Sequence, residues 1–353
     1  MYDANLGFQI NFVPLKSINM KKIVLSLIIL GSISCKNIST TKNETTMQLT
    51  PKIKEVLNHL EKIQVFQGEN PLDISRKNYD AMAQQLSGKK EAVAIIEEFN
   101  IPSENYQIPV RLYRPKGKTS NSAAIIYIHG GWFISGGYET HDAIVRKLSN
   151  ATGAVVLFVD YRLSPENPFP AGLNDCKDAT EWLINNAENL GIDSQKIGII
   201  GDSAGGTLAT ALSTELGSQL KFQVLIYPAS DNLLNTQSWE AYKSGPILNK
   251  EWGFQAWNWY LKSKEDKINP SAVPILIKDF KQTPETLVIL AEHDPLKDEG
   301  KQLSQNMKNS GISVKTSLYK DMVHGFMHMG IILPETQLAT KEIAEFIIKS
   351  LEK

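Results

Sequence analysis

Residues 197–206, Ile-Gly-Ile-Ile-Gly-Asp-Ser-Ala-Gly-Gly, combine a buried-strand pattern, a sharp turn and the start of a helix. The β-branched run before Gly201 predicts a strand, and the residues from Ala204 onward predict a helix packed closely against it. Gly201 and Gly205 leave room for this close approach, because neither has a side chain. Such a turn presents the Ser203 hydroxyl beside a helix N-terminus, which stabilises negative charge. The stretch therefore predicts a nucleophilic serine at residue 203.

Strand-like and helix-like segments alternate along the chain from about residue 91. The strand-like runs are 92–99, 108–113, 123–128, 155–159, 197–200, 224–227, 287–290 and 314–318. Amphipathic segments that favour helices lie at 141–152, 171–190, 204–217, 298–310 and 334–352. Apolar strands separated by helices predict an α/β fold, in which helices cover both faces of a mostly parallel, twisted sheet.

A serine hydroxyl is a weak nucleophile, so it needs a base and a residue that orients the base. After a strand–serine–helix turn, the acid comes next in the chain and the histidine last. Asp294 follows a buried strand and is the predicted acid; Asp298 is the alternative, its other role being to cap the following helix. His324 lies in a loop between the last predicted strand and the final helix, and is the predicted base. His293 and His328 remain alternatives.

A glycine pair directly follows the strand-like run 123–128, in the sequence His129-Gly130-Gly131-Trp132. Backbone amides at such a strand end can bind the negative oxygen of a tetrahedral intermediate. We predict that Gly130 and Gly131 donate to this oxygen together with the amide of Ala204. We expect His129 to be a structural hydrogen-bonding residue rather than a second base.

Two segments depart from the strand–helix alternation. Residues 51–90 have helical spacing, and about 231–270 form an insertion within the predicted catalytic domain 91–353. Long insertions in compact domains are usually functional. Four of the six tryptophans are in this part of the chain: Trp239, Trp252, Trp257 and Trp259. Their rings are expected either to line a lid over an apolar pocket or to pack the insertion onto the core.

The N-terminus has the features of an export signal. Basic residues at 21–22 precede an apolar stretch, 23–34, that is too short to span a bilayer, so 1–35 is predicted to be a leader and Met20 a candidate start. Small residues before Cys35 resemble a bacterial lipoprotein cleavage site, although Ser32 stands where Leu is usual. Residues 36–50 have the composition of a flexible tether. We therefore expect export, with either a lipid anchor on Cys35 or a periplasmic location in a bacterium.

Composition excludes several other functions. The formal net charge is -1, and no cluster of Lys and Arg indicates binding to nucleic acid. Cys35 and Cys176 are in such different contexts that a disulfide between them is not expected.

The sequence has no metal-ligand spacing, and the predicted chemistry needs no cofactor. His141 and Asp142 are expected to form a structural pair, and nothing indicates an oligomeric state.

Six segments together resemble the hormone-sensitive-lipase-like esterases and lipases, the bacterial family IV type, within the α/β-hydrolase superfamily. They are His129-Gly130-Gly131, Thr140-His141-Asp142, Tyr161–Glu166 with Phe169-Pro170-Ala171, Gly201–Gly206, Asp294–Glu299 and His324-Gly325-Phe326, in the family's order across about 90–353. The resemblance implies the α/β-hydrolase fold, the triad Ser203, Asp294 and His324, and an anion site at Gly130, Gly131 and Ala204. It also implies a helical cap, built from 51–90 and the insertion.

The expected activity is hydrolysis of a small-molecule carboxylic ester through an acyl-enzyme. The same triad serves amide and acetyl-sugar hydrolysis, and a binding protein built on a hydrolase fold is a more distant alternative. The sequence departs from the family at Trp132, where a third glycine is usual. If that position has a positive φ, the tryptophan is strained; if it does not, the indole is expected to narrow the substrate pocket.

Overall fold

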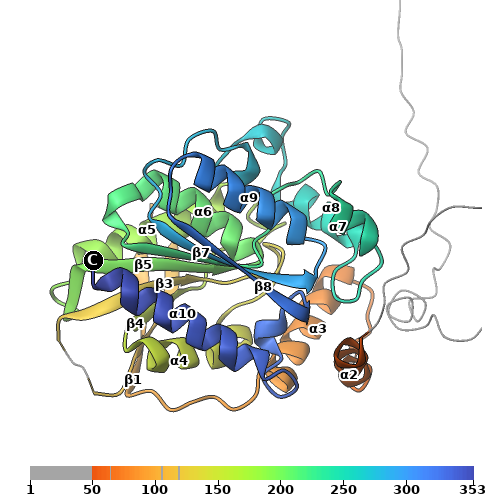
Figure 1. Ribbon diagram of the computed structural model, residues 1–353, viewed down its shortest axis with the longest axis horizontal. Helices are drawn as coiled ribbons and strands as arrows, with labels where there is room; N and C mark the ends of the chain where they lie inside the picture. The colour runs from red at the N-terminus through yellow and green to blue at the C-terminus, as the bar shows by residue number, and fades with distance from the viewer. Residues whose placement is uncertain (1–49, 64, 105, 118–119) are drawn as a thin grey trace, which may run out of the picture. The chain divides into compact units, whose positions relative to one another are not determined.

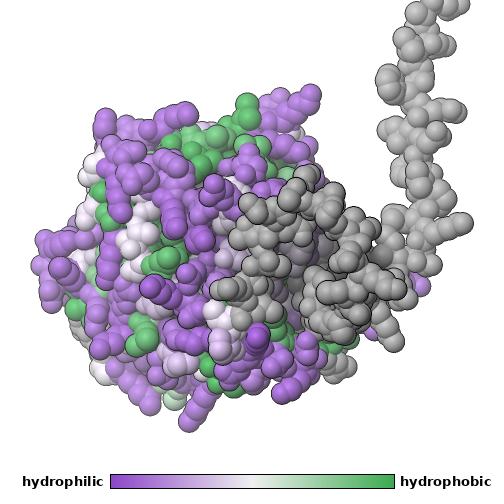
Figure 2. All heavy atoms as spheres, turned by 45° about the vertical axis from the view of Figure 1, so that its right-hand side comes forward, coloured by the Kyte–Doolittle hydropathy of each residue, from purple (hydrophilic) through white to green (hydrophobic). Residues whose placement is uncertain are grey.

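The computed structural model describes residues 50–353, except 64, 105, 118 and 119 (Figure 1). The predicted leader, Cys35 and nearly all of the predicted tether lie outside the described residues. Within the described part of the chain, no helix is long and apolar enough to cross a bilayer. The face shown in Figure 2 is mostly hydrophilic, with its hydrophobic residues in small groups. Most large apolar side chains are instead buried in the core.

An eight-stranded sheet forms the centre of the domain, in the order β1-β2-β4-β3-β5-β6-β7-β8. β2 runs antiparallel to both β1 and β4, whereas all other neighbouring pairs are parallel. The strands are β1 (Ile95–Pro102), β2 (Gln107–Arg114), β3 (Ser122–Ile128), β4 (Val155–Val159), β5 (Ile192–Asp202), β6 (Phe222–Ile226), β7 (Glu285–His293) and β8 (Val314–Val323). The predicted mostly parallel sheet is confirmed, with β5 and β8 longer than their predicted runs.

Helices cover both faces of the sheet, as predicted. Figure 1 shows α4 and α10 on one face and α5, α6 and α9 on the other. Their bounds are α4 (Tyr138–Thr152), α5 (Ala171–Asn185), α6 (Ala204–Leu216), α9 (Lys297–Asn309) and α10 (Glu335–Leu351). Leu208 and Leu303 belong to one buried cluster, and Ile144 and Ile343 belong to the other. Nearly all of α6 is buried, which explains why its sequence is apolar or small all around the helix.

Two helices precede the sheet in the chain, in the segment where helical spacing was predicted. They are α2 (Pro51–Leu60) and α3 (Pro71–Leu86). Thr50 and Asn70 cap them through side-chain oxygens that accept backbone N–H groups of the first turn. Each helix begins with proline, whose missing N–H is not needed there. Local capping chemistry thus fixes where both helices start.

The insertion between β6 and β7 is helical and packs its aromatic rings inward. It contains α7 (Gln237–Ala241), α8 (Lys250–Tyr260) and the short helices η2 (Asp266–Ile268) and η3 (Pro274–Leu276). Trp239 is fully buried and Trp257 is nearly so. Trp252 and Trp259 are partly buried and meet edge to face, with ring centroids 5.4 Å apart. All four rings therefore contribute to packing the insertion onto the domain.

A buried carboxyl on α9 holds the start of this insertion. Glu299 accepts hydrogen bonds from the backbone N–H groups of Ser230 at 2.7 Å and Asp231 at 3.3 Å. Its other oxygen accepts the indole N–H of Trp239 at 2.8 Å. Burial raises the pKa of Glu299 to about 8, although these three donors act to lower it. The protonation state of Glu299 is consequently coupled to the folding of the domain.

Replacing Glu299 with Gln is expected to remove part of the pH dependence of stability. Because the pKa is raised on folding, the unfolded chain releases this proton at lower pH than the folded chain does. The stability from Glu299 is therefore fully present below about pH 4.5 and is lost as pH rises through about 8, by at most about 1.4 kcal/mol per pH unit. Urea unfolding at about pH 5, 6.5 and 8 measures this difference between wild type and E299Q. A difference that stays constant over this range would contradict the raised pKa.

Candidate active site

Ser203 occupies the sharp turn between β5 and α6. Its backbone has φ 52° and ψ -120°, which is unusual for a residue with a side chain. The Ser203 N–H donates to Ile226 O at 2.8 Å, and its carbonyl accepts from Gly206 at 2.9 Å and from Ala229 at 3.1 Å. These bonds to the neighbouring strand end and to α6 hold the turn in place.

The two glycines beside Ser203 allow β5, α6 and β3 to approach one another. A Cβ atom at Gly201 would lie 2.3 Å from Gly205 O, and one at Gly205 would lie 2.1 Å from Ile128 O. Both distances are far shorter than a van der Waals contact. The close packing inferred from the sequence is therefore present, and any side chain at either position would displace backbone.

A chain of hydrogen bonds joins Ser203, His324 and Asp294. His324 Nε2 lies 2.9 Å from Ser203 Oγ, and His324 Nδ1 lies 2.8 Å from Asp294 Oδ2. Asp294 follows β7, and its Oδ1 accepts the N–H of Leu296 at 2.8 Å. Tyr227, after β6, packs its ring against the imidazole at 4.7 Å between centroids. The arrangement lets His324 take the hydroxyl proton while Asp294 stabilises the resulting imidazolium.

The alternative acid and bases lie elsewhere. Asp298 Oδ2 accepts the N–H of Ser238, so it fixes the start of α7 rather than capping its own helix. His293 Nδ1 is 3.2 Å from Tyr242 OH, and His328 is buried near Asp202. His129 stacks on Tyr161, and burial lowers its pKa to about 3. None of these histidines is hydrogen-bonded to Ser203.

The prediction that Gly130 supplies an anion-binding amide is wrong. Its N–H donates to Asp202 Oδ1 at 3.0 Å and is therefore occupied. Within the described chain, the N–H groups of Gly131, Trp132 and Ala204 have no hydrogen-bond acceptor. The unoccupied amides include those of Gly131 and Ala204, which the sequence analysis named, and that of Trp132, which the sequence pattern did not indicate.

Asp202, the residue before Ser203, holds the loop at Gly130 through hydrogen bonds to its side chain. Besides Gly130, its Oδ1 accepts the Tyr127 hydroxyl at 3.0 Å and lies 3.2 Å from His141 Nε2. Burial acts to raise the pKa of Asp202, but its interactions with His141 and His328 outweigh this and hold the pKa well below the usual value. The sequence analysis assigned Asp202 no role, because its partners are far away in the chain.

The expected pairing of His141 with Asp142 does not occur. His141 contacts Asp202 and lies 2.7 Å from Thr140 Oγ1. Asp142 instead accepts the Tyr113 hydroxyl and the Arg146 guanidinium, each at 2.9 Å. Consecutive residues in a helix point in different directions, so the two side chains serve separate networks.

Trp132 has a positive φ of 57°, the left-handed conformation that favours glycine. Its indole is only 9% exposed and lies 6.3 Å from the Trp239 ring. A Cβ atom at Gly253 would lie 3.2 Å from the Trp132 ring and 3.3 Å from the Trp239 ring. The missing side chain on α8 therefore makes room for the tryptophan. Of the two alternatives from the sequence, the first therefore applies: the position has a positive φ, and the tryptophan is strained there.

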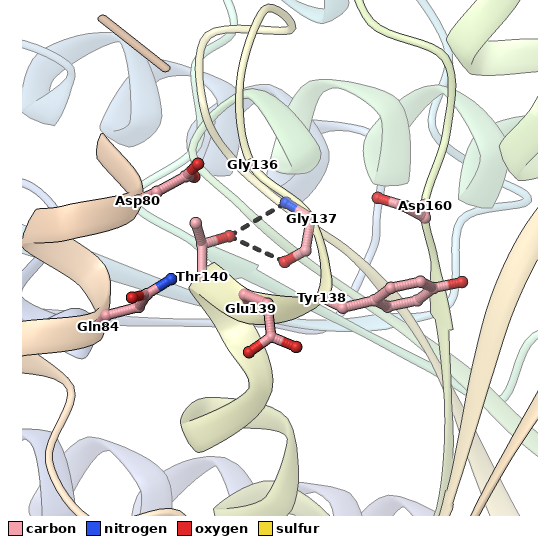
Figure 3. Close-up of a pocket in the computed structure, with 8 residues that line it drawn as sticks. All are labelled: Asp80, Gln84, Gly136, Gly137, Tyr138, Glu139, Thr140 and Asp160. Carbon is pink, nitrogen blue, oxygen red and sulfur yellow. Dashed lines mark hydrogen bonds between the residues drawn. The ribbon is translucent and has the colours of Figure 1, made fainter. Parts of the chain in front are cut away.

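A polar cavity of about 290 Å³ lies beside the N-terminus of α4, away from Ser203 (Figure 3). Asp80, Glu139 and Asp160 line it, and Thr140 closes one wall through hydrogen bonds to Gly137. Burial raises the pKa of Asp160 to about 6. No member of the hydrogen-bonded chain lines this cavity, and Ser203 itself is 6% exposed.

Comparisons with known proteins agree with this fold. A sequence profile described as alpha/beta hydrolase fold matches residues 125–328. An ethyl acetate hydrolase of Pseudomonas putida is 32% identical over 290 residues, which are 79% of this chain and 90% of the relative. An arylesterase of Saccharolobus solfataricus is 32% identical over 294 residues, 80% and 93% of the two chains. The solved structure of a Pyrobaculum calidifontis esterase has a TM-score of 0.77 at 34% identity, covering 86% of this chain and 99% of that one.

At position 132, a glycine substitution should destabilise the protein less than an alanine substitution, the reverse of the usual order of stability. Both W132A and W132G lose the buried indole, which typically costs about 3–5 kcal/mol. Because φ is positive, we expect W132G to be more stable than W132A by about 1 kcal/mol, whereas glycine is normally the less stable choice. Urea unfolding of the two variants measures this difference. Equal stability, or a more stable alanine variant, would show that the left-handed conformation carries no strain.

Proposed function

The chain belongs to the hormone-sensitive-lipase-like branch of the α/β-hydrolase family, and on this premise we propose that it hydrolyses small carboxylic esters through a covalent acyl-serine. The observation that carries the proposal is the hydrogen-bond chain from Ser203 through His324 to Asp294. A hydroxyl, an imidazole and a carboxylate in this order, each within hydrogen-bond distance of the next, are the groups that nucleophilic acyl transfer requires.

In the first half of the reaction, Ser203 Oγ attacks the ester carbonyl carbon while His324 Nε2 takes the hydroxyl proton. The carbonyl oxygen becomes an oxyanion, which the N–H groups of Gly131, Trp132 and Ala204 bind. The intermediate collapses, the C–O bond to the alcohol breaks, and His324 gives its proton to the leaving oxygen. Water then attacks the acyl-serine, again with His324 as base, and releases the acid and the free serine.

The proposed substrates have short to medium acyl chains. The Trp132 indole lies beside the anion loop, between that loop and the insertion, and is nearly buried. Two relatives carry the names ethyl acetate hydrolase and arylesterase, which favour small or aromatic esters for this chain as well. We further propose that α3 and the insertion act as a cap over the site, which fits the low exposure of Ser203 and His324.

Ser203→Ala is expected to abolish ester hydrolysis. Loss of the nucleophile should lower kcat/KM for p-nitrophenyl acetate by at least about 10⁴-fold, and D294N should lower kcat by about 10⁴-fold because His324 loses its orientation. Hydrolysis is followed as release of p-nitrophenolate, with circular dichroism as the control for folding. Activity of S203A equal to that of wild type would remove the assignment. Wild-type hydrolysis of p-nitroacetanilide but not of the ester would favour an amidase.

Trp132→Gly is expected to widen the substrate range. Removing the indole should raise kcat/KM for p-nitrophenyl decanoate relative to the acetate by about 10-fold, the size of effect that one or two methylene groups have in an apolar pocket. A second series, with a constant acetyl group and alcohols of increasing size, distinguishes the two sides of the site. If the preference for acyl length changes, Trp132 narrows the acyl side of the site; if the preference for alcohol size changes, it narrows the alcohol side. If neither preference changes, the proposed role of Trp132 in specificity is wrong.

A further inference from the structure

Three side chains with metal-ligating atoms converge where β7 and β8 end. His293 Nε2 lies 3.8 Å from Glu292 Oε2 and 3.9 Å from Asp321 Oδ1, and one ligand atom from each residue lies within 4.8 Å of the others. All three residues are partly exposed, the side chains by 14% for His293, 37% for Glu292 and 44% for Asp321. The group therefore borders solvent, from which an ion can enter.

A strand irregularity creates this convergence. Glu292 and His293 are consecutive, so in a regular strand they would point to opposite faces. The pairing of β7 with β8 shifts at this point: Ala291 is opposite Tyr319, and His293 is opposite Val323. Asp321 lies in the longer β8 segment, and its N–H donates to Glu292 Oε2 at 2.9 Å. Bulges commonly redirect side chains in this way.

The His293 ring has a polar partner at its second nitrogen, which is a common feature of metal-binding histidines. Its Nδ1 lies 3.2 Å from the hydroxyl of Tyr242, at the end of α7. If Nδ1–H donates to this hydroxyl, Nε2 has its lone pair free and directed toward the two carboxylates. Metal-ligating histidines usually donate their second N–H to such a partner, which fixes the tautomer. A lone pair and two carboxylates that face one another are stabilised by a cation between them.

We propose that Glu292, His293 and Asp321 bind one divalent transition-metal ion, with Zn²⁺ as the best match. One imidazole nitrogen and two carboxylate oxygens suit Zn²⁺ better than Ca²⁺ or Mg²⁺, which prefer oxygen ligands alone. Ligand atoms of tetrahedral zinc at 2.0–2.1 Å lie about 3.3 Å apart. The separations of 3.8 and 3.9 Å between His293 Nε2 and the two carboxylates exceed this by about 0.5 Å, and the two carboxylate oxygens lie within 4.8 Å of each other. A water molecule completes the fourth position.

A second group, His141, Asp202 and His328, also places three ligand atoms within 4.8 Å, but it suits an ion less well. Its side chains are at most 2% exposed. Asp202 Oδ1 already accepts hydrogen bonds from Tyr127 and Gly130. Binding there would disrupt the anion loop, whereas binding at Glu292, His293 and Asp321 would leave it intact.

The bound ion would join the strand ends that carry the acid and the base of the active site. Asp294 directly follows His293, and His324 is three residues after Asp321. The ion binds the folded chain and not the separated strands, so it should raise the midpoint of thermal unfolding. Catalysis itself does not depend on the ion in this proposal, since the ligands are distinct from Ser203, His324 and Asp294.

Isothermal titration of the metal-stripped protein with ZnCl₂ tests the site, using protein without a histidine tag. We expect one ion per chain, and at least about 10-fold weaker binding in each of E292Q, H293Q and D321N. Tyr242→Phe should weaken binding by about 10-fold, since it removes only the partner of Nδ1. Circular dichroism checks that each variant folds, and CaCl₂ should bind far more weakly than ZnCl₂.

Three control variants distinguish binding at this site from binding elsewhere on the chain. E240Q removes an exposed carboxylate on α7 and should change the affinity by less than about twofold. S203A should bind Zn²⁺ as wild type does, so failure of the ester-hydrolase proposal would leave this one standing. No binding, or binding unaffected by E292Q, H293Q and D321N, would overturn the proposal. Binding abolished by H328Q but retained in H293Q would place the ion in the buried group and would also overturn it.

Discussion

The structure depends on one steric constraint, the close approach of β5, α6 and β3 around Ser203. Gly201 and Gly205 have no side chains, and a Cβ atom on either would overlap backbone of a neighbouring element. At this contact Ser203 has a positive φ, and its hydroxyl lies 2.9 Å from His324 Nε2. The cost of the strained turn is offset by its hydrogen bonds to β6 and α6 and by the burial of α6.

Two buried carboxyls connect this turn to the rest of the site. Asp202 accepts the N–H of Gly130, whereas the next two N–H groups, of Gly131 and Trp132, have no acceptor among the described residues. Glu299 holds the start of the insertion through Ser230, Asp231 and Trp239. Both carboxyls are buried, so each hydrogen bond replaces one to water. Loss of any of these bonds would leave a buried polar group without a partner, which destabilises the folded state. They keep the anion loop and the insertion at fixed positions around the nucleophile.

Trp132 shows how a departure from a family pattern is accommodated. The backbone has the positive φ that glycine favours, although the residue is large. The indole packs against Trp239 in the space left by Gly253 on α8. The Trp132 side chain thus packs against residues of the insertion, about a hundred residues later in the chain.

The sequence by itself determined the alternation of strands and helices, the serine turn, and the choice of Asp294 and His324 over their rivals. These features are local: periodicity, turn chemistry and position after a strand are all contained in a few neighbouring residues. Only the tertiary structure decided that Gly130 is occupied by Asp202, that Glu299 anchors the insertion, and that Glu292, His293 and Asp321 meet. Each of these contacts joins residues brought together by strand register or by packing between distant segments. A hydrogen bond forms only when donor and acceptor lie within a few tenths of an ångström of the right distance, and residue spacing along the chain does not specify this.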